Sequence, residues 1–411
     1  MLVCGEPSGD LHASQLVAAL KERADVEVVA AGGPRLAAAG ADVAWDSTGW
    51  GAIGVPDALL KLPLYFRAMG QLVRAIETRK DLDMLVLVDF GAFNLRLAAR
   101  VRRRRPSLPI FYYFPPASWD RRRRYWHRLL RLSDYIASPF PWNAAILASQ
   151  GATVRWVGHP AVDRISPPND KGAEKERLGV SRDSVVIGLF PGSRRLERDL
   201  LGPVFLDAGR LLRQRLPKVE VFWSQPPAGS GEAGMRARPT GPGLCATLLS
   251  RLPGLGDDAS LGVGTWRSYV RPIADSAALL RAADVALTCF GTITLEAALA
   301  DCPIVSSYRG NLLMKIQYRL MRIPTPYYSL PNIIVGARVT PEIYGDDATA
   351  EALAQAAYRL LTTKTERERI LAAYARVREE LGPPGAAQRA AEMVLQALQG
   401  ELRPHRRAVE W

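Results

Sequence analysis

Residues 184–197, SVVIGLFPGSRRLE, decide the fold of this chain. The run from Val185 to Phe190 is apolar and β-branched, which predicts a buried strand. Pro191, Gly192 and Ser193 form a turn that leads into a helix. A short apolar strand that enters a helix through such a turn is half of a βαβ unit, whose parallel strands are buried on both faces. The stretch therefore predicts a parallel α/β protein.

The same strand-then-helix rhythm recurs along the chain. Before residue 184 its strands are VEVVAAGG (26–33), DMLVLVDF (83–90), LPIFYYF (108–114) and DYIASPF (134–140). After it they are KVEVFWS (218–224), DVALTCF (284–290) and PIVSSYR (303–309). Residues 165–179, ISPPNDKGAEKERLG, are polar and contain prolines, so we expect a linker there.

The rhythm and the linker predict two doubly wound, Rossmann-like domains. We expect residues 1–165 to form the first and 166–375 the second, with a Gly- and Pro-rich flexible insertion at 224–243 and a helical tail at 376–411. The composition from Ala348 to Gly400 is helical throughout. Ligands of such folds bind at the carboxyl ends of the strands, here in a cleft between the domains.

Composition is that of a soluble globular protein, with 48% hydrophobic and 23% charged residues. No window reaches the roughly 18 apolar residues that a membrane span needs, and the first residues lack a basic flank followed by an apolar core, so we expect no secretory signal. The four cysteines have no metal-ligand spacing, so we expect reduced thiols, no metal and no cofactor.

The net charge of +13 comes largely from arginine runs at 102–105 and 121–124. Such runs attract nucleic acid, anionic lipid or phosphorylated substrates. The alternative is a solvated arginine-rich face.

Two loops in the second half are suited to anions. Gly192 and Ser193 let the backbone approach a ligand at a helix N-terminus, and Arg194 adds a guanidinium fork. Gly291 and Thr292 repeat this arrangement, and Glu296, one turn on, could accept hydrogen bonds from a ribose. Together they indicate a nucleotide diphosphate, although each could be an ordinary turn. Neither matches GxxxxGK[ST] or GxGxxG, which disfavours ATP hydrolysis and hydride transfer.

Three features of the first half are candidates for chemistry. Asp89 ends a strand beside a glycine and is our candidate general base, its alternative role being to cap a helix beginning at Asn94. His159 lies in a loop near the domain boundary and is either catalytic or structural. The loop GEPSGD (5–10) is a phosphate cradle, a catalytic corner or a tight turn in which Ser8 or Asp10 caps the first helix.

Six motifs together resemble one family. GEPSGD, GGPRLAAAG, VGHPAVD, FPGSRRLE, GTITLEAAL and SLPN occur in the order and spacing of lipid-A-disaccharide synthases, and the resemblance extends to about Leu361. These are inverting glycosyltransferases of the GT-B fold, which is built from two facing Rossmann-like domains. The family transfers a 2,3-diacylglucosamine from its UDP conjugate to the 6-hydroxyl of an acylated glucosamine 1-phosphate and releases UDP.

The resemblance implies a role for each matching residue. Arg194, with Gly192 and Ser193, would contact the diphosphate; Glu296, with Gly291 and Thr292, would hold the ribose and phosphates; Asn332 of SLPN would lie beside the nucleotide. Asp89 matches the family's essential aspartate. Glu6, Ser8, Asp10 and His159 would then belong to the acceptor side. Helix dipoles and arginine can stabilise departing UDP, so no metal is required.

Three positions depart from the family pattern. Ala92 stands where a second aspartate is usual, Phe290 replaces a serine, and Gly345 replaces a glutamine. A GT-B enzyme acting on a different glycolipid and a UDP-sugar epimerase are therefore the alternatives. A non-enzymatic RNA binder is a third, although aromatics interleaved with the arginines are few, and we expect no nucleic-acid partner.

Two apolar stretches with basic interruptions indicate a membrane surface. Residues 58–69, ALLKLPLYFRAM, and residues 312–321 have the composition of interfacial helices, and a core-facing amphipathic helix is the alternative. We expect a cytoplasmic protein that associates peripherally with the anionic inner face of the cell membrane.

Overall fold

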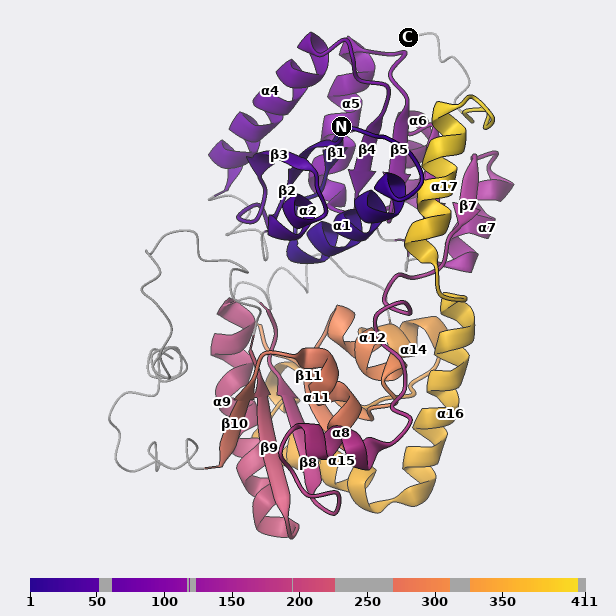
Figure 1. Ribbon diagram of the computed structural model, residues 1–411. Helices are drawn as coiled ribbons and strands as arrows, with labels where there is room; N and C mark the ends of the chain where they lie inside the picture. Colours follow the sequence, from indigo (N-terminus) through magenta and orange to yellow (C-terminus); the bar gives the residue numbers. More distant parts are fainter. Residues whose placement is uncertain are drawn as a thin grey trace. The chain divides into compact units, whose positions relative to one another are not determined.

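The computed structural model describes residues 1–51, 61–116, 118, 123–193, 195–225, 269–310 and 326–405. The chain forms two compact units, one of residues 1–163 with 380–411 and the other of residues 164–379 (Figure 1). The predicted insertion at 224–243 lies almost wholly outside the described residues, as do Arg194 and the stretch 312–321.

The first unit is a parallel sheet of seven strands covered by helices. The sheet order is β3-β2-β1-β4-β5-β6-β7. Its strands are β1 (Leu2–Val3), β2 (Val29–Gly32), β3 (Asp42–Asp46), β4 (Leu85–Val88), β5 (Ile110–Tyr113), β6 (Tyr135–Ser138) and β7 (Val154–Trp156). Its helices are α1 (Pro7–Lys21), α2 (Pro34–Ala38), α4 (Leu62–Thr78), α5 (Gly91–Arg104), α6 (Arg123–Leu132), α7 (Pro141–Ser149) and α17 (Ala386–Leu398).

The second unit repeats this plan with six parallel strands in the order β10-β9-β8-β11-β12-β13. The strands are β8 (Val185–Phe190), β9 (Val219–Ser224), β10 (Val270–Ile273), β11 (Val285–Cys289), β12 (Ile304–Tyr308) and β13 (Glu342–Tyr344). The helices are α8 (Lys171–Arg177), α9 (Arg195–Arg215), α11 (Ser276–Ala282), α12 (Thr292–Leu299), α14 (Leu330–Val335), the short 3₁₀ turn η3 (Gly345–Asp347), α15 (Ala350–Thr362) and α16 (Lys364–Leu381).

The five inner strands of the first sheet are buried on both faces and almost wholly apolar, whereas the edge strands β3 and β7 are partly exposed and carry charged residues. Along β4, Val86 and Val88 join the core on the side of α1 and α17, whereas Leu85 and Leu87 join the core under α4 and α5. Alternating side chains of one strand thus enter two cores, as in doubly wound folds. The prediction of a parallel, doubly wound α/β fold is confirmed.

The structure adds two features to the expected organisation of the chain. The supposed linker contains helix α8, whose N-terminus is capped by the Asp170 side chain through bonds of 2.8 Å to the Gly172 N–H and 3.3 Å to the Ala173 N–H. An ion pair of 2.8 Å between Lys175 and Asp284 ties α8 to the rest of its unit. The final helices are present as expected, but residues 380–405 belong to the first unit, because the alanine-rich face of α17 packs on α1.

The arginine run at 102–105 is not a uniformly solvated face. Arg102 is buried, pairs with Asp134 and donates to the carbonyls of Leu132 (3.0 Å) and Leu108 (2.7 Å). Arg105 donates to the carbonyls of Ile76 (2.9 Å) and Arg79 (2.7 Å). Arg102 and Arg105 therefore stabilise the first unit through internal bonds and do not form part of a surface for polyanions.

Candidate functional site

The predicted loops lie at the switch points of the two sheets. Strand order reverses between β1 and β4 in the first unit and between β8 and β11 in the second. Loops that leave a parallel sheet in opposite directions at such a point open a crevice at the carboxyl ends of the strands. The loop 5–10 and Asp89 follow β1 and β4, whereas Gly192 and Gly291 follow β8 and β11.

Asp89 is held in an unusual backbone conformation at the end of β4. Asp89 and Phe90 have φ angles of 48° and 47°, in the left-handed region that non-glycine residues rarely adopt. The Asp89 N–H donates to the Tyr113 carbonyl (3.0 Å), and its carbonyl accepts from the Asn94 amide and the Tyr112 hydroxyl, both at 2.9 Å. These bonds offset a strain of about 1–3 kcal/mol per residue, which typically occurs at functional sites.

The partners of Asp89 are themselves fixed. Asn94 is fully buried, and burial together with the nearby Asp89 charge raises the pKa of Tyr112 well above its usual value, so its hydroxyl remains a donor. Helix α5 begins at Gly91, with Phe90 as its N-cap residue. The expected helix start at Asn94, with Asp89 as its cap, was therefore wrong. Asn94 instead lies inside the helix, and its side-chain amide donates to the Asp89 carbonyl and holds the loop.

The glycines around Asp89 serve close packing. A Cβ atom on Gly5 would lie 2.1 Å from the Phe90 ring, and one on Gly91 would lie 2.1 Å from the Pro116 Cβ. The loop after β1 and the loop after β4 are therefore in direct contact at the switch point. This contact favours a role for loop 5–10 in shaping the Asp89 region over a role as a phosphate cradle.

Asp10 has a structural role that its sequence position did not reveal. Its buried carboxylate accepts three backbone bonds at the start of α2, from the N–H groups of Gly33 (2.8 Å), Leu36 (3.2 Å) and Arg35 (3.1 Å). Both carboxylate oxygens are thus used inside the protein. Asp10 was expected either to face the acceptor or to cap the first helix, and the structure instead places it as the cap of α2.

Glu6 and Ser8 lie at the N-terminus of α1. Glu6 is the N-cap residue, with no capping bond from its side chain, and Ser8 is already inside the first turn. Both side chains are half-buried. The alternative in which Ser8 caps this helix is therefore wrong, and its role toward an acceptor stays a prediction.

His159 is buried in an aromatic cluster of the first unit. Its Nδ1 accepts a bond of 3.2 Å from the Ala161 N–H, which places the proton of a neutral ring on Nε2. Its ring lies 5.2 Å from that of Phe114, which stacks at 4.2 Å on the ring of His12. This packing favours the structural role of His159 over the catalytic one.

The first anion loop of the second unit is shaped by Gly192. Its φ angle is 118°, and a Cβ there would lie 2.3 Å from the Glu197 carboxylate, so only glycine fits. Ser193 is exposed at the N-terminus of the long helix α9, and its carbonyl accepts from Arg198 at 2.5 Å. Arg194 lies outside the described residues, so its contact with a diphosphate stays a prediction.

The second anion loop begins helix α12. Gly291 is the N-cap residue, with a φ angle of 128°, and Thr292 is the first helical residue. The Thr294 hydroxyl donates to the Gly291 carbonyl (2.8 Å) and accepts from the Leu330 N–H (3.1 Å), which joins α12 to the start of α14. These two bonds fix the N-terminus of α12 against the start of α14.

Glu296 has a partner that sequence analysis missed. Arg164 donates to its Oε1 at 2.8 Å, and the two side chains are 29% and 16% exposed. The pair fixes one carboxylate oxygen of Glu296, and the contact of Glu296 with a ribose stays a prediction. The two residues lie far apart in the sequence, so no local pattern could have indicated this pair.

Asn332 does not have a free amide group. Its Nδ2 donates to the Thr340 carbonyl (3.0 Å) and Glu342 Oε1 (2.8 Å), and its Oδ1 accepts from the N–H groups of Val339 and Thr340, both at 2.8 Å. Asn332 is fully buried. It therefore fastens the segment before β13 to α14, and its position beside a nucleotide stays a prediction.

Phe290, which stands where the family has a serine, belongs to an aromatic cluster at the carboxyl ends of β11, β12 and β13. Its ring stacks with those of Tyr328 (5.3 Å) and Tyr308 (6.1 Å), and Tyr344 packs edge-on against Tyr328 (5.0 Å). The replacement thus supplies an apolar wall beside Gly291 where a hydroxyl is usual.

Within the described residues, no group of three or more His, Cys, Asp or Glu side chains is arranged to hold a metal ion. Cys4, Cys289 and Cys302 are buried free thiols, and burial raises the pKa of Cys302 to about 12. None of the helices in the described ranges is long and apolar enough to cross a membrane.

Comparisons with known proteins agree with this architecture. A family model for lipid-A-disaccharide synthetase matches residues 1–228 and 268–397. The lipid-A-disaccharide synthase of Geobacter metallireducens is 34% identical over 400 residues, which cover 97% of each chain. Among solved structures, the S. aureus MnaA–UDP co-structure has a TM-score of 0.61 at 16% identity and covers 99% of each chain. CalG4, the calicheamicin glycosyltransferase, has a TM-score of 0.57 at 17% identity, with 98% of each chain covered.

Two Rossmann-like domains, each with its loops at the switch point of a parallel sheet, define the GT-B fold. The family match over most of the chain and the identity with the Geobacter enzyme then show the family. The chain belongs to the lipid-A-disaccharide synthases and is a hexosyltransferase.

Proposed function

We propose that this enzyme transfers a 2,3-diacylglucosamine unit from its UDP conjugate to the 6-hydroxyl of a 2,3-diacylglucosamine 1-phosphate and releases UDP. The single observation that carries the proposal is the rigidly held Asp89 at the switch point of the first sheet, in a chain of this family. Family membership also favours transfer over the alternative of a UDP-sugar epimerase.

Asp89 would act as the general base for the acceptor hydroxyl. A base must keep a fixed position while it accepts the proton, because misplacement by an ångström is costly. The bonds from Asn94 and Tyr112 to the Asp89 carbonyl supply this rigidity, and the left-handed backbone sets the direction in which the side chain leaves the strand.

The second unit would bind UDP. The N-termini of α9 and α12 follow the two switch-point strands, and the dipole of a helix favours, at its N-terminus, the negative charge that develops on departing UDP. Glu296, held by Arg164, would accept hydrogen bonds from the ribose hydroxyls. The co-structure of the MnaA fold neighbour with UDP supports a nucleotide site in this fold. Arg194 would contact the diphosphate.

The transfer is tested by incubating the enzyme with UDP-2,3-diacylglucosamine and candidate acceptors and reading the products by mass spectrometry. Asp89→Ala should lower turnover by about 10²- to 10⁴-fold while UDP binding persists. Asp83→Ala, an exposed aspartate just before the same strand, is the matched control. A product formed from a different acylated acceptor would show that the enzyme acts on another glycolipid. Unchanged turnover in Asp89→Ala would contradict the role of Asp89 as the general base.

UDP binding is tested by calorimetry. Arg194→Ala should weaken the affinity, whereas Arg210→Ala, in the C-terminal half of α9, should not. Equal affinities of wild type and Arg194→Ala would overturn the assignment of Arg194.

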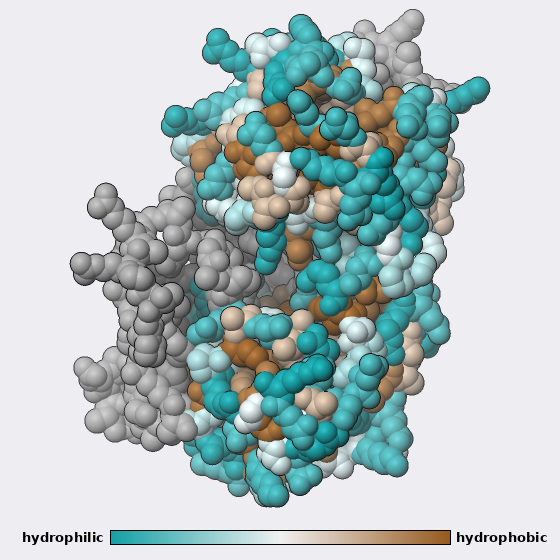
Figure 2. Space-filling model, in the orientation of Figure 1, coloured by the Kyte–Doolittle hydropathy of each residue, from teal (hydrophilic) through white to brown (hydrophobic). Residues whose placement is uncertain are grey.

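The membrane contact of this enzyme would include the start of α4. This helix buries Ala68, Met69, Leu72 and Ile76 in the core, yet Leu62, Leu64 and Phe66 are 40%, 42% and 63% exposed. In Figure 2 apolar atoms reach the surface of the first unit near this end of α4, among hydrophilic side chains. Pro63 lies in the first turn, where it is compatible with a helix. Exposed apolar residues beside Lys61 and Arg67 have the character of a peripheral anchor.

Sedimentation with anionic vesicles tests this contact. Binding should be strong at low salt and weaken as salt rises. Phe66→Ser combined with Leu64→Ser should reduce it, whereas Leu398→Ser, an equally exposed leucine of α17, should not. Failure of the wild-type protein to sediment at low salt would contradict an anionic membrane partner and the expected location at the inner face of the cell membrane.

A further inference from the structure

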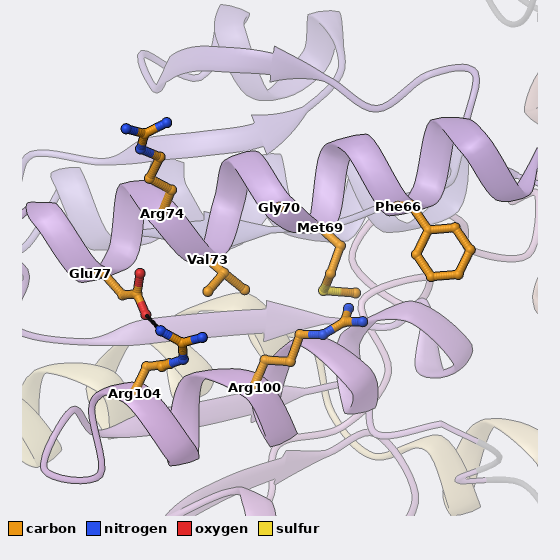
Figure 3. Close-up of a pocket in the computed structure, with 8 residues that line it drawn as sticks. All are labelled: Phe66, Met69, Gly70, Val73, Arg74, Glu77, Arg100 and Arg104. Carbon is orange, nitrogen blue, oxygen red and sulfur yellow. Dashed lines mark ion pairs between the residues drawn. The ribbon is translucent and has the colours of Figure 1, made fainter.

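A groove of about 430 Å³ runs between α4 and α5 on the first unit (Figure 3). Its α4 wall is formed by Phe66, Met69, Gly70, Val73, Arg74 and Glu77, and its α5 wall by Arg100 and Arg104. Met69 and Val73 point toward α5, and Arg100 extends toward Met69 from the opposite wall, whereas Arg74 points away. The floor is thus apolar and one wall is basic.

Gly70 keeps the groove open. It lies in the middle of α4, where glycine is the least favourable residue apart from proline. Among the residues that the structure describes, none has an atom within 4 Å of a Cβ placed at this position, so packing against them does not explain the glycine. A larger side chain there would fill space that is otherwise available to a ligand.

The charges around the groove fit an anionic lipid. Arg104 pairs with Glu77 at 3.3 Å, and the pair closes one end of the groove. The half-buried Arg100 is set over the apolar floor, where its methylene stem can pack on a hydrocarbon chain while its guanidinium remains available to an anion.

The other end of the groove, at Phe66, lies one residue along α4 from a side chain that packs on the candidate catalytic loop. Tyr65, the neighbour of Phe66, packs its ring 6.4 Å from that of Phe90 and 6.2 Å from that of Phe93. Phe90 directly follows Asp89. Because α4 and α5 both start at the carboxyl edge of the sheet, the groove leads from the Asp89 loop toward the opposite edge.

We propose that this groove binds one acyl chain of the acceptor glycolipid. The chain would lie along Met69, Gly70 and Val73, and the sugar would remain at the Phe66 end, near Asp89. The inference rests on the proposed function, because it assumes an acylated acceptor whose hydroxyl reacts at Asp89. In this proposal the residues of α4 and α5 recognise the length of the acyl chain.

The test uses acylated glucosamine 1-phosphate acceptors with chains short enough to stay monomeric, without vesicles. In the wild-type enzyme the acceptor KM should fall as the chain lengthens. Gly70→Leu should flatten this dependence and raise KM for the longest chain by about tenfold, the equivalent of about 1.4 kcal/mol. Gln71→Leu adds the same side chain to an exposed position of α4 outside the groove and is the matched control.

Photolabelling of the wild-type enzyme gives a readout that does not depend on the folding of a variant. An acceptor with a diazirine at the end of its chain should label peptides from α4 and α5. Labelling confined to other peptides, or a wild-type chain-length dependence retained in Gly70→Leu, would overturn the proposal. Weaker vesicle binding of Gly70→Leu without a change in KM would overturn it too, because the groove would then serve the membrane alone. No transfer to any acceptor, despite UDP binding, would instead contradict the proposed function.

Discussion

Replacement of Asp10 distinguishes an acceptor-binding role from the structural role that its contacts indicate. The carboxylate accepts three backbone N–H bonds at the start of α2 and is 5% exposed. In Asp10→Ala these three donors lose their partner in a site with little access for water. An unsatisfied buried N–H costs about 1–3 kcal/mol. With about 1 kcal/mol for each donor, we expect the first unit to lose about 3 kcal/mol of stability.

Differential scanning calorimetry measures this loss. A unit of about 200 residues shifts its Tm by roughly 2–4 °C per kcal/mol, so the transition of the first unit should fall by about 6–12 °C. Asp10→Asn keeps an acceptor oxygen but loses the charge, so the Tm of the first unit should fall by about half as much in this variant. Asp42→Ala removes an exposed carboxylate of the same unit and should leave the transition in place.

The kinetic result completes the test. Below the melting transition, Asp10→Ala should retain the wild-type acceptor KM, because both oxygens are used inside the protein. An unchanged Tm with a raised acceptor KM would refute the reasoning, since the carboxylate would then act on the substrate.

Three further predictions concern other residues. Arg164→Gln should weaken UDP binding severalfold in calorimetry, because Glu296 loses the partner that orients it. The free energy of unfolding should change by less than about 1 kcal/mol. A wild-type affinity for UDP would remove Arg164 from the site. Asn332→Ala should destabilise the second unit by about 2–4 kcal/mol in urea titrations, because it leaves the donors and acceptors before β13 unpaired. Normal stability with weakened UDP binding would instead support direct contact of Asn332 with the nucleotide. Burial lowers the pKa of His405 below its usual 6.5, so the unfolded chain binds the proton more tightly, and stability should fall as pH drops from about 6.5 toward the folded-state pKa. His405→Gln should flatten this decline in pH-dependent unfolding, and an identical pH profile would exclude His405 as its source.

The sequence by itself determined the fold class and the location of the main loops. Continuous apolar runs such as DMLVLVDF, each followed by a helix, require strands buried on both faces, and this requirement yields parallel doubly wound sheets. Because ligand-binding loops of such sheets follow the strands, Asp89, Gly192 and Gly291 could be chosen before the strand order was known. Their motifs also sufficed to indicate the family.

Only the tertiary structure decided what individual polar side chains do. Asp10 and Asn332 resemble site residues by motif, yet their polar atoms bond to N–H, carbonyl and carboxylate groups of segments that fold against them. Arg164 gave no local signal, because its partner Glu296 comes close only when the second unit folds. The physical reason is that a hydrogen bond depends on distances of a few ångströms, whereas a strand or helix is specified by the periodicity of its own residues.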